Sequence, residues 1–307
     1  MEMKAQDGNE LIQQVISDEN LWNAYEKVKK NKGAPGIDGI TVYELEAHMQ
    51  KYYRSLKLKL SEGTYQPQPV KRVAIPKQDG SKRYLGIPCV LDRVVQQAIL
   101  QVIEPRIDPY FSENSFGFRK GRNAHQAIKL AEQYYENGYR TVVDCDLKSY
   151  FDTIHHQRIH AYLEEFISDK VILKLIWRFL RSGILDKDIY IKTTEGTPQG
   201  GPLSPILANI YLNKLDRKLE ERGHRFIRYA DDFVIYVKSP RAGERVMESI
   251  STYIEKDLGL TINQKKSQVC SATSATFLGF NIQKLMGKSD AGLTSRLNKD
   301  LKTNSRN

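Results

Sequence analysis

The chain has 307 residues, of which 40% are hydrophobic and 9% aromatic, so it carries enough apolar side chains to fold around a core instead of remaining disordered. This length suits one large domain or two smaller ones. The net charge of +10 favours a polyanionic partner or an acidic membrane surface, and charge alone does not choose between them.

Nothing in the sequence predicts a membrane segment or a secretion signal. Residues 1–18 are polar and carry acids, unlike a signal peptide. The longest apolar candidate, residues 171–180, is interrupted by Lys174 and Arg178 and is shorter than the roughly 20 residues of a membrane helix. The three cysteines lie far apart and form no C-x-x-C pair, which argues against a zinc site or a disulfide framework. We therefore expect a soluble protein of the reducing cytoplasm.

Apolar spacing and turn-forming residues predict the first elements. Helices are expected over residues 9–31 and 42–60, where apolar residues recur at helical intervals. The segment between them, residues 31–39, holds three glycines and a proline and must form a loop. Alternating runs over residues 70–76 and 82–87 flank turn-forming residues and predict a β-hairpin.

The rest of the chain alternates predicted helices with predicted strands. Helices are expected over residues 92–104, 124–135, 156–166, 169–182, 205–222 and 241–258. Strands are expected over residues 141–146, 268–272 and 276–283, and a strand, tight turn and second strand over residues 226–237. The pattern predicts an α+β fold in which a small sheet carries helices on one face.

Two adjacent acids, Asp231 and Asp232, lie at the centre of an apolar, β-rich run. Neighbouring side chains of a straight strand face opposite ways, so both acids reach one site only at a hairpin turn. Two carboxylates there repel each other and lose hydration, and a bound divalent cation would remove both penalties. An ordinary turn facing solvent is the alternative, and this pattern leaves both open.

A second acidic strand end follows residue 141. Alternation places Asp144 and Asp146 on one face of the predicted strand. Asp152 is expected to cap the helix that follows it. If the two acidic strand ends lie side by side in a sheet, three carboxylates converge on Mg²⁺, which accepts protein carboxylates and substrate phosphates. A pair of such ions serves phosphoryl transfer.

Several motifs, in this order, resemble those of the reverse transcriptase family. After a basic hairpin, residues 146–152 (Asp-Leu-Lys-Ser-Tyr-Phe-Asp) resemble the first acidic motif of that family. Residues 197–205 (Thr-Pro-Gln-Gly-Gly-Pro-Leu-Ser-Pro) resemble its loop and helix that hold template and incoming nucleotide. Residues 229–232 (Tyr-Ala-Asp-Asp) are similar to its catalytic turn, and residues 277–280 (Phe-Leu-Gly-Phe) resemble the hairpin that grips the primer.

Within the family, the chain most resembles group II intron-encoded reverse transcriptases, the maturases. Residues 31–39 look like their N-terminal loop, and residues 83–88 and 115–122 look like their fingers segments. The resemblance implies a right-hand polymerase with fingers and an antiparallel palm sheet packed on helices. Because family members continue into a thumb and this chain stops soon after Phe280, we expect fingers and palm with the thumb absent.

The resemblance also implies how the chain is divided. The expected parts are an N-terminal extension and loop over residues 1–45, fingers over residues 46–140 with some interleaving with the palm, a palm with the catalytic site over residues 141–285, and a polar tail over residues 286–307.

Catalytic roles follow from the resemblance, residue by residue. Asp146, Asp231 and Asp232 would bind two Mg²⁺ ions, with Mn²⁺ as a substitute, and Leu147 is included among the metal-binding positions. Asp146 is preferred to Asp144 because the family places an aromatic residue five positions after the ligand, where Phe151 stands. Lys266 would donate a proton to the leaving pyrophosphate.

A second set of residues would bind the incoming nucleotide. Phe151 would lie under its sugar and leave no room for a 2′-hydroxyl, which implies dNTPs; a core aromatic is the alternative. Lys77 and Arg83 flank the turn of the basic hairpin and would hold the triphosphate, with a solvated charged hairpin as the alternative. Gln199 and Gly200 would line the site.

Two further groups are assigned from the pattern. Phe118 and Arg119 would touch the template, since aromatic and basic residues suit stacking and phosphate contact. His156 and His160 share a predicted helical face, but no third metal ligand lies near that pair in sequence. These two histidines and His155 are therefore expected at the surface or as caps.

The implied function is that of an RNA-directed DNA polymerase of a group II intron. It would add dNTPs to a DNA primer on intron RNA and, as a maturase, would bind that RNA in splicing and mobility. The alternative is an RNA-binding splicing cofactor whose polymerase activity is secondary or absent in this chain; a relative used in phage defence or alongside CRISPR genes is a third candidate. The expected partners are intron RNA, a DNA primer or target and dNTPs, with no membrane and with a homodimer left open.

Overall fold

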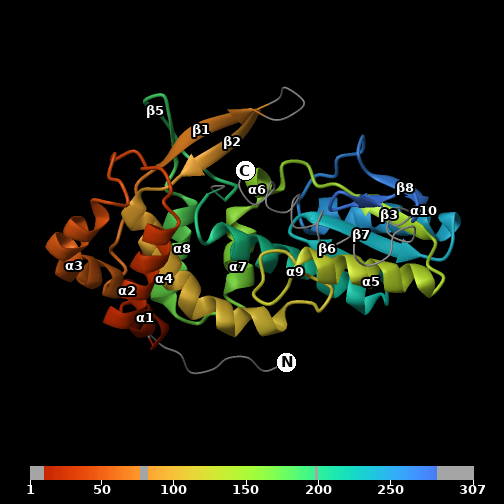
Figure 1. The fold of residues 1–307 in the computed structure, drawn as a ribbon, viewed down its shortest axis with the longest axis horizontal. Helices are drawn as coiled ribbons and strands as arrows, with labels where there is room; N and C mark the ends of the chain where they lie inside the picture. The colour runs from red at the N-terminus through yellow and green to blue at the C-terminus, as the bar shows by residue number, and fades with distance from the viewer. Residues whose placement is uncertain (1–9, 77–81, 198–199, 282–307) are drawn as a thin grey trace, which may run out of the picture. The chain divides into compact units, whose positions relative to one another are not determined.

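Two compact units make up the chain, and each is assembled from two separated segments. The computed structural model describes residues 10–76, 82–197 and 200–281 (Figure 1). The first unit combines the residues up to Tyr110 with Ser149–Tyr211, and the second combines Phe111–Lys148 with the residues from Leu212 onward. Helix α9 (Ser204–Glu221) belongs to both, since the boundary falls after Tyr211.

Helices dominate the first unit. They are α1 (Glu10–Val15), α2 (Asp18–Lys30), α3 (Leu45–Ser61), α4 (Val90–Ile107) with a 3₁₀ turn at Asp108–Tyr110, α6 (Tyr150–Thr153), α7 (His156–Leu163) and α8 (Lys170–Leu180). The single helix predicted over residues 9–31 is wrong. Ser17 leaves the helical region with ψ 145°, and its hydroxyl accepts a hydrogen bond from the backbone N–H of Asn20, so it caps α2 as a separate helix.

A mixed four-stranded sheet completes the first unit. The predicted hairpin is confirmed as β1 (Val70–Pro76) and β2 (Lys82–Ile87), which pair antiparallel. The sequence prediction missed β4 (Ile184–Asp186) and β5 (Ile189–Ile191), which extend the sheet in the order β2-β1-β4-β5. Strands of three residues are too short to show the alternation that predicts a strand.

The second unit is built on an antiparallel sheet of order β6-β7-β3-β8. Its strands are β3 (Thr141–Cys145), β6 (Arg225–Tyr229), β7 (Asp232–Val237) and β8 (Gln268–Ser271), and a separate small hairpin joins β9 (Thr276–Phe277) to β10 (Phe280–Asn281). Its helices are α5 (Ala124–Glu136), the second half of α9, and α10 (Pro240–Thr252), which continues as one π-helical turn over Tyr253–Asp257. The strands predicted over residues 141–146 and 226–237 are confirmed.

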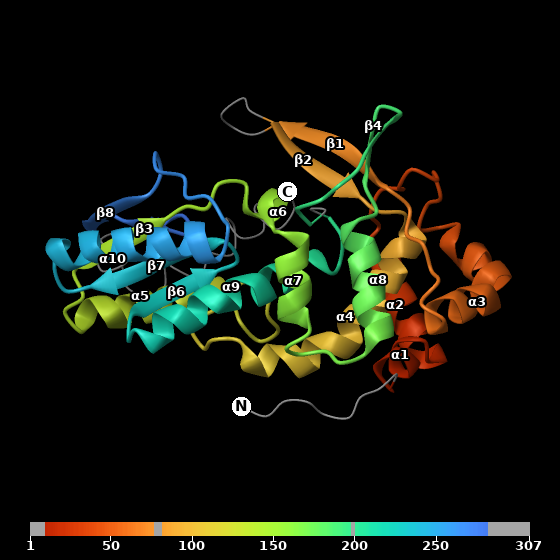
Figure 2. The same ribbon diagram turned by 180° about the vertical axis from the view of Figure 1, so that it is seen from behind.

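Helices cover both faces of this sheet, so the predicted arrangement with helices on one face is wrong. On one face Val142 and Val234 pack with Ala127 and Ala131 of α5. The opposite face is covered by α10, which crosses in front of β7 in Figure 2. Gly243 lets α10 approach closely, because a Cβ atom there would meet a methyl carbon of Val269 at 2.5 Å.

No helix in the described ranges is both long and apolar enough to cross a membrane.

Candidate active site

The two adjacent acids lie at a tight hairpin turn, as predicted. Tyr229 pairs with Asp232 across β6 and β7, so Ala230 and Asp231 are the two residues of the turn. Ala230 has φ 59°, the left-handed region that glycine prefers at this place in a two-residue hairpin. A side chain in this conformation is costly and persists where surrounding structure enforces it, which is common at functional sites.

The two acidic strand ends lie side by side. Strands β3 and β7 are antiparallel neighbours, with Cys145 opposite Phe233 and Asp144 opposite Val234. Continuing this register by one step places Asp146 opposite Asp232. Alternation puts Asp144 and Asp232 on the face that carries Val234. The sheet therefore brings together acids that are 86 positions apart in the chain (232 − 146 = 86).

Crowding of these carboxylates disturbs their protonation. Burial, then repulsion from Asp144, Asp231 and Asp146, raises the pKa of Asp232 to about 7, against one hydrogen bond from the backbone of Leu278 that lowers it. Asp232 itself is exposed to solvent, unlike the five residues of β7 that follow it. Burial, followed by repulsion from Asp146, raises the pKa of Asp144 to about 6. Within the described residues, burial and neighbouring carboxylates therefore raise the pKa of two acids of this cluster.

A turn from the distant part of the chain holds Asp146. The Asn263 side-chain amide donates to the Asp146 carboxylate over 2.8 Å, and the Asn263 backbone N–H donates to the Asp146 carbonyl over 2.8 Å. The Asp146 backbone N–H donates to the Ser267 hydroxyl over 3.0 Å. The sequence prediction missed Asn263 and Ser267, because no local pattern links them to an acid in another segment.

Lys266 and Leu147 lie in the same surroundings. The backbone N–H of Lys266 donates to the carbonyl of Asn263, so this lysine belongs to the turn that binds Asp146, and its side chain is exposed. Leu147 is buried and forms an isolated antiparallel bridge with Ile262. Their proposed catalytic and metal-binding roles stay predictions.

The hairpin of β9 and β10 reaches the acid cluster through its turn. Leu278 and Gly279 both have positive φ, 53° and 79°, the pattern of a type I′ turn. A hydrogen bond from the Leu278 backbone to Asp232 ties this turn to the acid cluster. The segment that resembles the primer-gripping hairpin is therefore a hairpin in direct contact with an expected metal ligand.

The carboxylate oxygens of this site are suitable ligands for a divalent cation. The side chains are not, however, already arranged around a metal position. Within the part of the chain that the structure describes, no group of three or more His, Cys, Asp or Glu side chains is arranged to hold a metal ion. Carboxylate oxygens are nevertheless the donors that Mg²⁺ takes, and the raised pKa values of Asp144 and Asp232 reflect burial first and repulsion second, both of which a cation would offset.

In the first unit, the backbone of Phe151 is hydrogen-bonded to the loop that begins at Thr197. Phe151 lies in the short helix α6, half-buried, with its ring edge-on to that of Tyr150 at 5.4 Å. Its backbone carbonyl accepts a hydrogen bond of 2.7 Å from the Thr197 N–H. The aromatic residue and the Thr-Pro-Gln-Gly segment, 46 positions apart (197 − 151 = 46), therefore form one local structure.

Close backbone approaches fix the described part of that loop. A Cβ atom at Gly200, where φ is +133°, would meet the Gly86 carbonyl of β2 at 2.6 Å. A Cβ at Gly201 would meet the Gln96 side-chain oxygen at 2.5 Å, and the same oxygen accepts from the Leu203 N–H. Glycine is needed at position 200, where φ is positive and a backbone carbonyl blocks a side chain, whereas a side chain at position 201 would have to displace Gln96.

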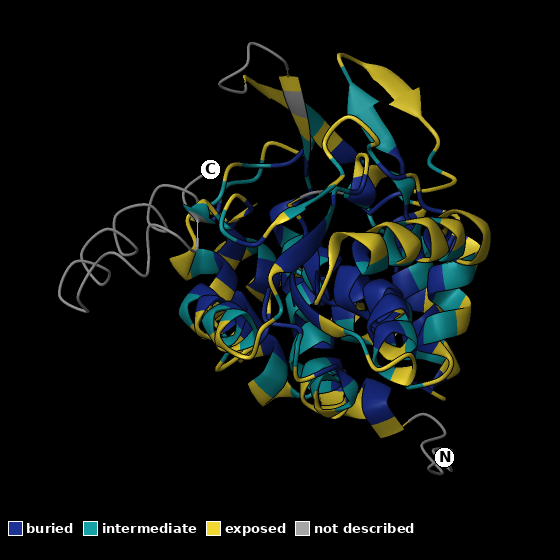
Figure 3. Ribbon diagram, turned by 90° about the vertical axis from the view of Figure 1, so that its right-hand side faces the viewer, coloured by how far each residue is buried: buried dark blue, intermediate teal, exposed yellow. Residues whose placement is uncertain are grey.

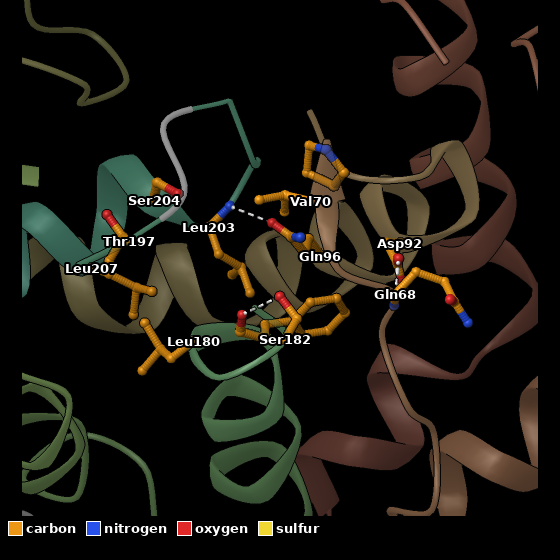
Figure 4. A pocket seen from close by; sticks show the side chains of 12 residues that line it. Gln68, Val70, Asp92, Gln96, Leu180, Ser182, Thr197, Leu203, Ser204 and Leu207 are labelled. Atoms are coloured by element: carbon orange, nitrogen blue, oxygen red, sulfur yellow. Dashed lines mark hydrogen bonds between the residues drawn. The ribbon is translucent and has the colours of Figure 1, made fainter. Parts of the chain in front are cut away.

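A small cavity of about 20 Å³ lies beneath this loop and is shown in Figure 4. Its lining includes Gln96, Leu203, Thr197 and Asp92. Asp92 is 2% exposed and accepts hydrogen bonds from the Tyr65 hydroxyl and the Gln68 backbone N–H. Burial raises the pKa of Asp92 to about 6. This volume holds about one water molecule, so it supports the loop and is too small for a nucleotide.

The predicted triphosphate ligands are only partly within the described residues. Lys77 and Gln199 lie outside them, and the backbone of Arg83 pairs with Ile75 in the β1–β2 hairpin. Arg72 in the same hairpin forms an ion pair with Asp186 at 3.3 Å and stacks over the Tyr84 ring. The Arg72 guanidinium therefore already has a carboxylate partner and an aromatic partner within the mixed sheet.

Two assignments made from the sequence are wrong. His156 is 2% exposed, and its Nε2 atom lies 2.7 Å from the Gly196 carbonyl, so it supports the segment just before Thr197 instead of lying at the surface. Arg119, expected at the template, is buried and donates to the carbonyls of Ser112 and Ser115. Its neighbour Phe118 is 49% exposed.

Comparison with known proteins agrees with this arrangement. A family model described as reverse transcriptase (RNA-dependent DNA polymerase) matches residues 75–282. Protein YkfC of Escherichia coli (strain K12) is 34% identical, over 84% of this chain and 78% of YkfC. The group II intron-encoded protein LtrA of Lactococcus lactis subsp. cremoris is 29% identical over 89% of this chain, which spans 56% of LtrA.

Solved structures show the same fold. A chain of a partial Cas6-RT-Cas1–Cas2 complex aligns over 80% of this chain and 43% of its own length, with a TM-score of 0.50 and 26% identity. A telomerase from Candida tropicalis, in complex with a TWJ fragment of telomeric RNA, aligns over 79% of this chain and 47% of its own length, with a TM-score of 0.56 and 14% identity, which bears on fold alone. The α+β architecture with its antiparallel sheet is therefore that of reverse transcriptase fingers and palm. On the family model, the relatives and this fold, the chain belongs to the reverse transcriptase (RNA-dependent DNA polymerase) family, in the branch of group II intron-encoded proteins.

Proposed function

We propose that this chain is the polymerase core of a group II intron reverse transcriptase, which extends a DNA primer with dNTPs on intron RNA. The observation that carries the proposal is the meeting of two acidic strand ends, Asp146 on one strand and the Asp231–Asp232 turn on its neighbour, in a cluster where burial and then repulsion raise the pKa of Asp232. Such a cluster is costly without a cation, and two-metal phosphoryl transfer gives it a purpose.

Each group has a proposed task. Asp146, Asp231 and Asp232, with Leu147 beside them, would hold two Mg²⁺ ions, which would supply activation of the primer hydroxyl and stabilisation of charge on the pyrophosphate. Lys266 protonates the leaving pyrophosphate. Gly200 and Gln199 line the nucleotide site, Lys77 and Arg83 hold the triphosphate, and Phe151 excludes a 2′-hydroxyl.

The domain limits are part of the same proposal. Residues 46–140 form the fingers and residues 141–285 the palm, with an N-terminal extension over residues 1–45 and a tail over residues 286–307. The protein is proposed to act in the bacterial cytoplasm, where intron RNA is made.

Primer extension tests the polymerase proposal. We expect the chain to extend a DNA primer on an RNA template when Mg²⁺ and dNTPs are present, and Asp231→Ala to abolish extension with an unchanged unfolding midpoint. Asp257→Ala, an exposed acid of the same unit, is the matched control and should extend normally. Normal extension by Asp231→Ala would refute the site assignment.

A maturase role is proposed beside it, on the grounds of the net charge of +10 and of the similarity to LtrA, named as a group II intron-encoded protein. Affinity for the intron RNA that flanks the gene should exceed affinity for an unrelated RNA of equal length at several salt concentrations. Equal affinities throughout would exclude this role and leave the polymerase proposal intact.

A further inference from the structure

A buried ion pair lies directly behind the Asp-Asp turn. Arg228 of β6 and Asp216 of α9 both have fully buried side chains. The Arg228 Nε atom donates to Asp216 Oδ1 over 2.8 Å and its Nη2 atom to Asp216 Oδ2 over 2.6 Å. The remaining nitrogen, Nη1, donates to the Ala230 carbonyl over 2.9 Å. One guanidinium thus joins a helix to the first residue of the turn.

The turn needs such support because its backbone is strained. Ala230 has φ 59°, a conformation that an alanine rarely adopts. An unsupported turn would relax and move Asp231, which follows directly. The Arg228 contact holds the carbonyl side of Ala230, so it acts on the peptide that joins Ala230 to Asp231.

The other side of the turn is packed by a second segment. A Cβ atom at Gly117 would lie 2.2 Å from the Ala230 nitrogen, so this glycine lies directly on the turn backbone. The Phe116 N–H donates to the Arg228 carbonyl over 2.8 Å, and the Arg228 N–H donates to the Asn114 carbonyl over 2.9 Å. The backbone of Arg228 is therefore fixed independently of its side chain.

Stability alone does not account for this pair. Removing two charges from water is expensive, and apolar residues of similar volume often replace buried ion pairs without loss of stability. The planar fork of arginine serves Asp216 and the Ala230 carbonyl together, whereas a lysine offers a single nitrogen. The geometry of the pair is directed at the turn.

We propose that Arg228, oriented by Asp216, is a positioning residue that fixes the Ala230 carbonyl and thereby sets the placement of Asp231 and Asp232 for catalysis. This inference rests on the proposed polymerase function. Arg228 touches no substrate, so its loss should lower the rate of the chemical step and leave the KM for dNTP close to that of the unmodified chain.

The main test is the double variant Asp216→Leu/Arg228→Met, which replaces the pair by apolar side chains of similar size. Arg228→Lys, which keeps the charge but not the fork, is the second variant. Ile250→Val, at a fully buried position of α10 away from the turn, is the control for a general loss of stability. Deuterium exchange is followed for the peptides spanning residues 229–233 and 141–145, together with single-turnover extension.

We expect at least tenfold faster exchange in residues 229–233, little change in residues 141–145, and at least a tenfold lower kcat at unchanged KM. Ile250→Val should show neither effect. If a folded double variant exchanges and extends like the unmodified chain, or if exchange rises equally in both peptides, the proposal is overturned. Exchange needs no activity, so absence of extension by the unmodified chain would refute the polymerase proposal and leave positioning to be judged by exchange.

Discussion

The two four-stranded sheets of this protein are built for opposite purposes. In the antiparallel sheet of the second unit, β7 is buried from Phe233 to Val237 between helices on both faces. In the mixed sheet of the first unit, every residue of β5 is exposed and β1 is buried only at Val70 (Figure 3). A sheet packed on both faces fixes the side chains at its strand ends to within a fraction of an ångström, which a set of metal ligands needs. An open sheet leaves its basic and aromatic side chains in contact with solvent, where they are available to a polyanion.

The largest expected effect is a difference in the rate of DNA synthesis. It is measured by substituting one acid at the antiparallel sheet and one acid in the mixed sheet. Asp146→Asn should lower RNA-templated DNA synthesis by about a thousandfold, because a metal ligand supplies several kcal/mol of charge stabilisation in the transition state. Asp186→Asn, which removes the partner of Arg72 in the mixed sheet, should change the rate less than about threefold, as expected of a partly exposed ion pair outside the acid cluster. Steady-state primer extension measures both, and equal losses would end the distinction between the sheets.

Core packing gives the next largest contrast. Ile235→Ala in β7 should lower the free energy of unfolding by about 3 kcal/mol, because it empties a fully buried position. Ile189→Ala in β5, where the side chain is 67% exposed, should change it by less than about 0.5 kcal/mol. Urea unfolding with matched m-values checks the pair, and similar losses would show that the mixed sheet is covered in solution.

A substitution at Phe151 tests the selectivity for dNTP over rNTP, and not the rate of catalysis. Phe151→Ala opens space beside Tyr150 and should lower the preference for dNTP over rNTP by about 10- to 100-fold, with a smaller effect on dNTP incorporation. Competition between dATP and ATP in single-nucleotide extension measures it. Phe151→Tyr, which keeps the ring, is the control and should retain the preference. An unchanged preference in the alanine variant would mean that this ring is a core aromatic.

The last expected effect concerns Asp92, which anchors the residue Gln68 just ahead of β1. Burial raises its pKa to about 6 in the folded protein, so below about pH 4 both states bind the proton and the stabilisation is fully present. Stability should then fall between about pH 4 and pH 6, by no more than about 3 kcal/mol from this residue, and should change little from it above pH 6. Asp92→Asn should flatten that part of the profile in metal-free thermal unfolding; an identical slope would contradict the assignment.

Local patterns predicted a large part of this molecule. The limits of β1 and β2 follow from alternation and turn residues, and the Asp231–Asp232 turn follows from two apolar β-rich runs that meet at polar residues. These features depend on side-chain periodicity and backbone preference, which a short window of sequence contains. At Ser17 the helical spacing of apolar residues continues through a residue that can also end a helix. The local sequence therefore predicts one helix, and the structure forms two.

The sequence by itself determined the reverse transcriptase motifs, the acids Asp146, Asp231 and Asp232, and the strands that carry them. Only the tertiary structure decided what surrounds those acids. Asn263 on Asp146, and the pair of Arg228 and Asp216 behind Ala230, join segments that no local pattern connects. Burial also decided the roles of His156 and Arg119, whose side chains support loops instead of facing solvent. The reason is physical: a hydrogen bond or a pKa depends on which groups folding brings within a few ångströms, and separation along the chain does not report that distance.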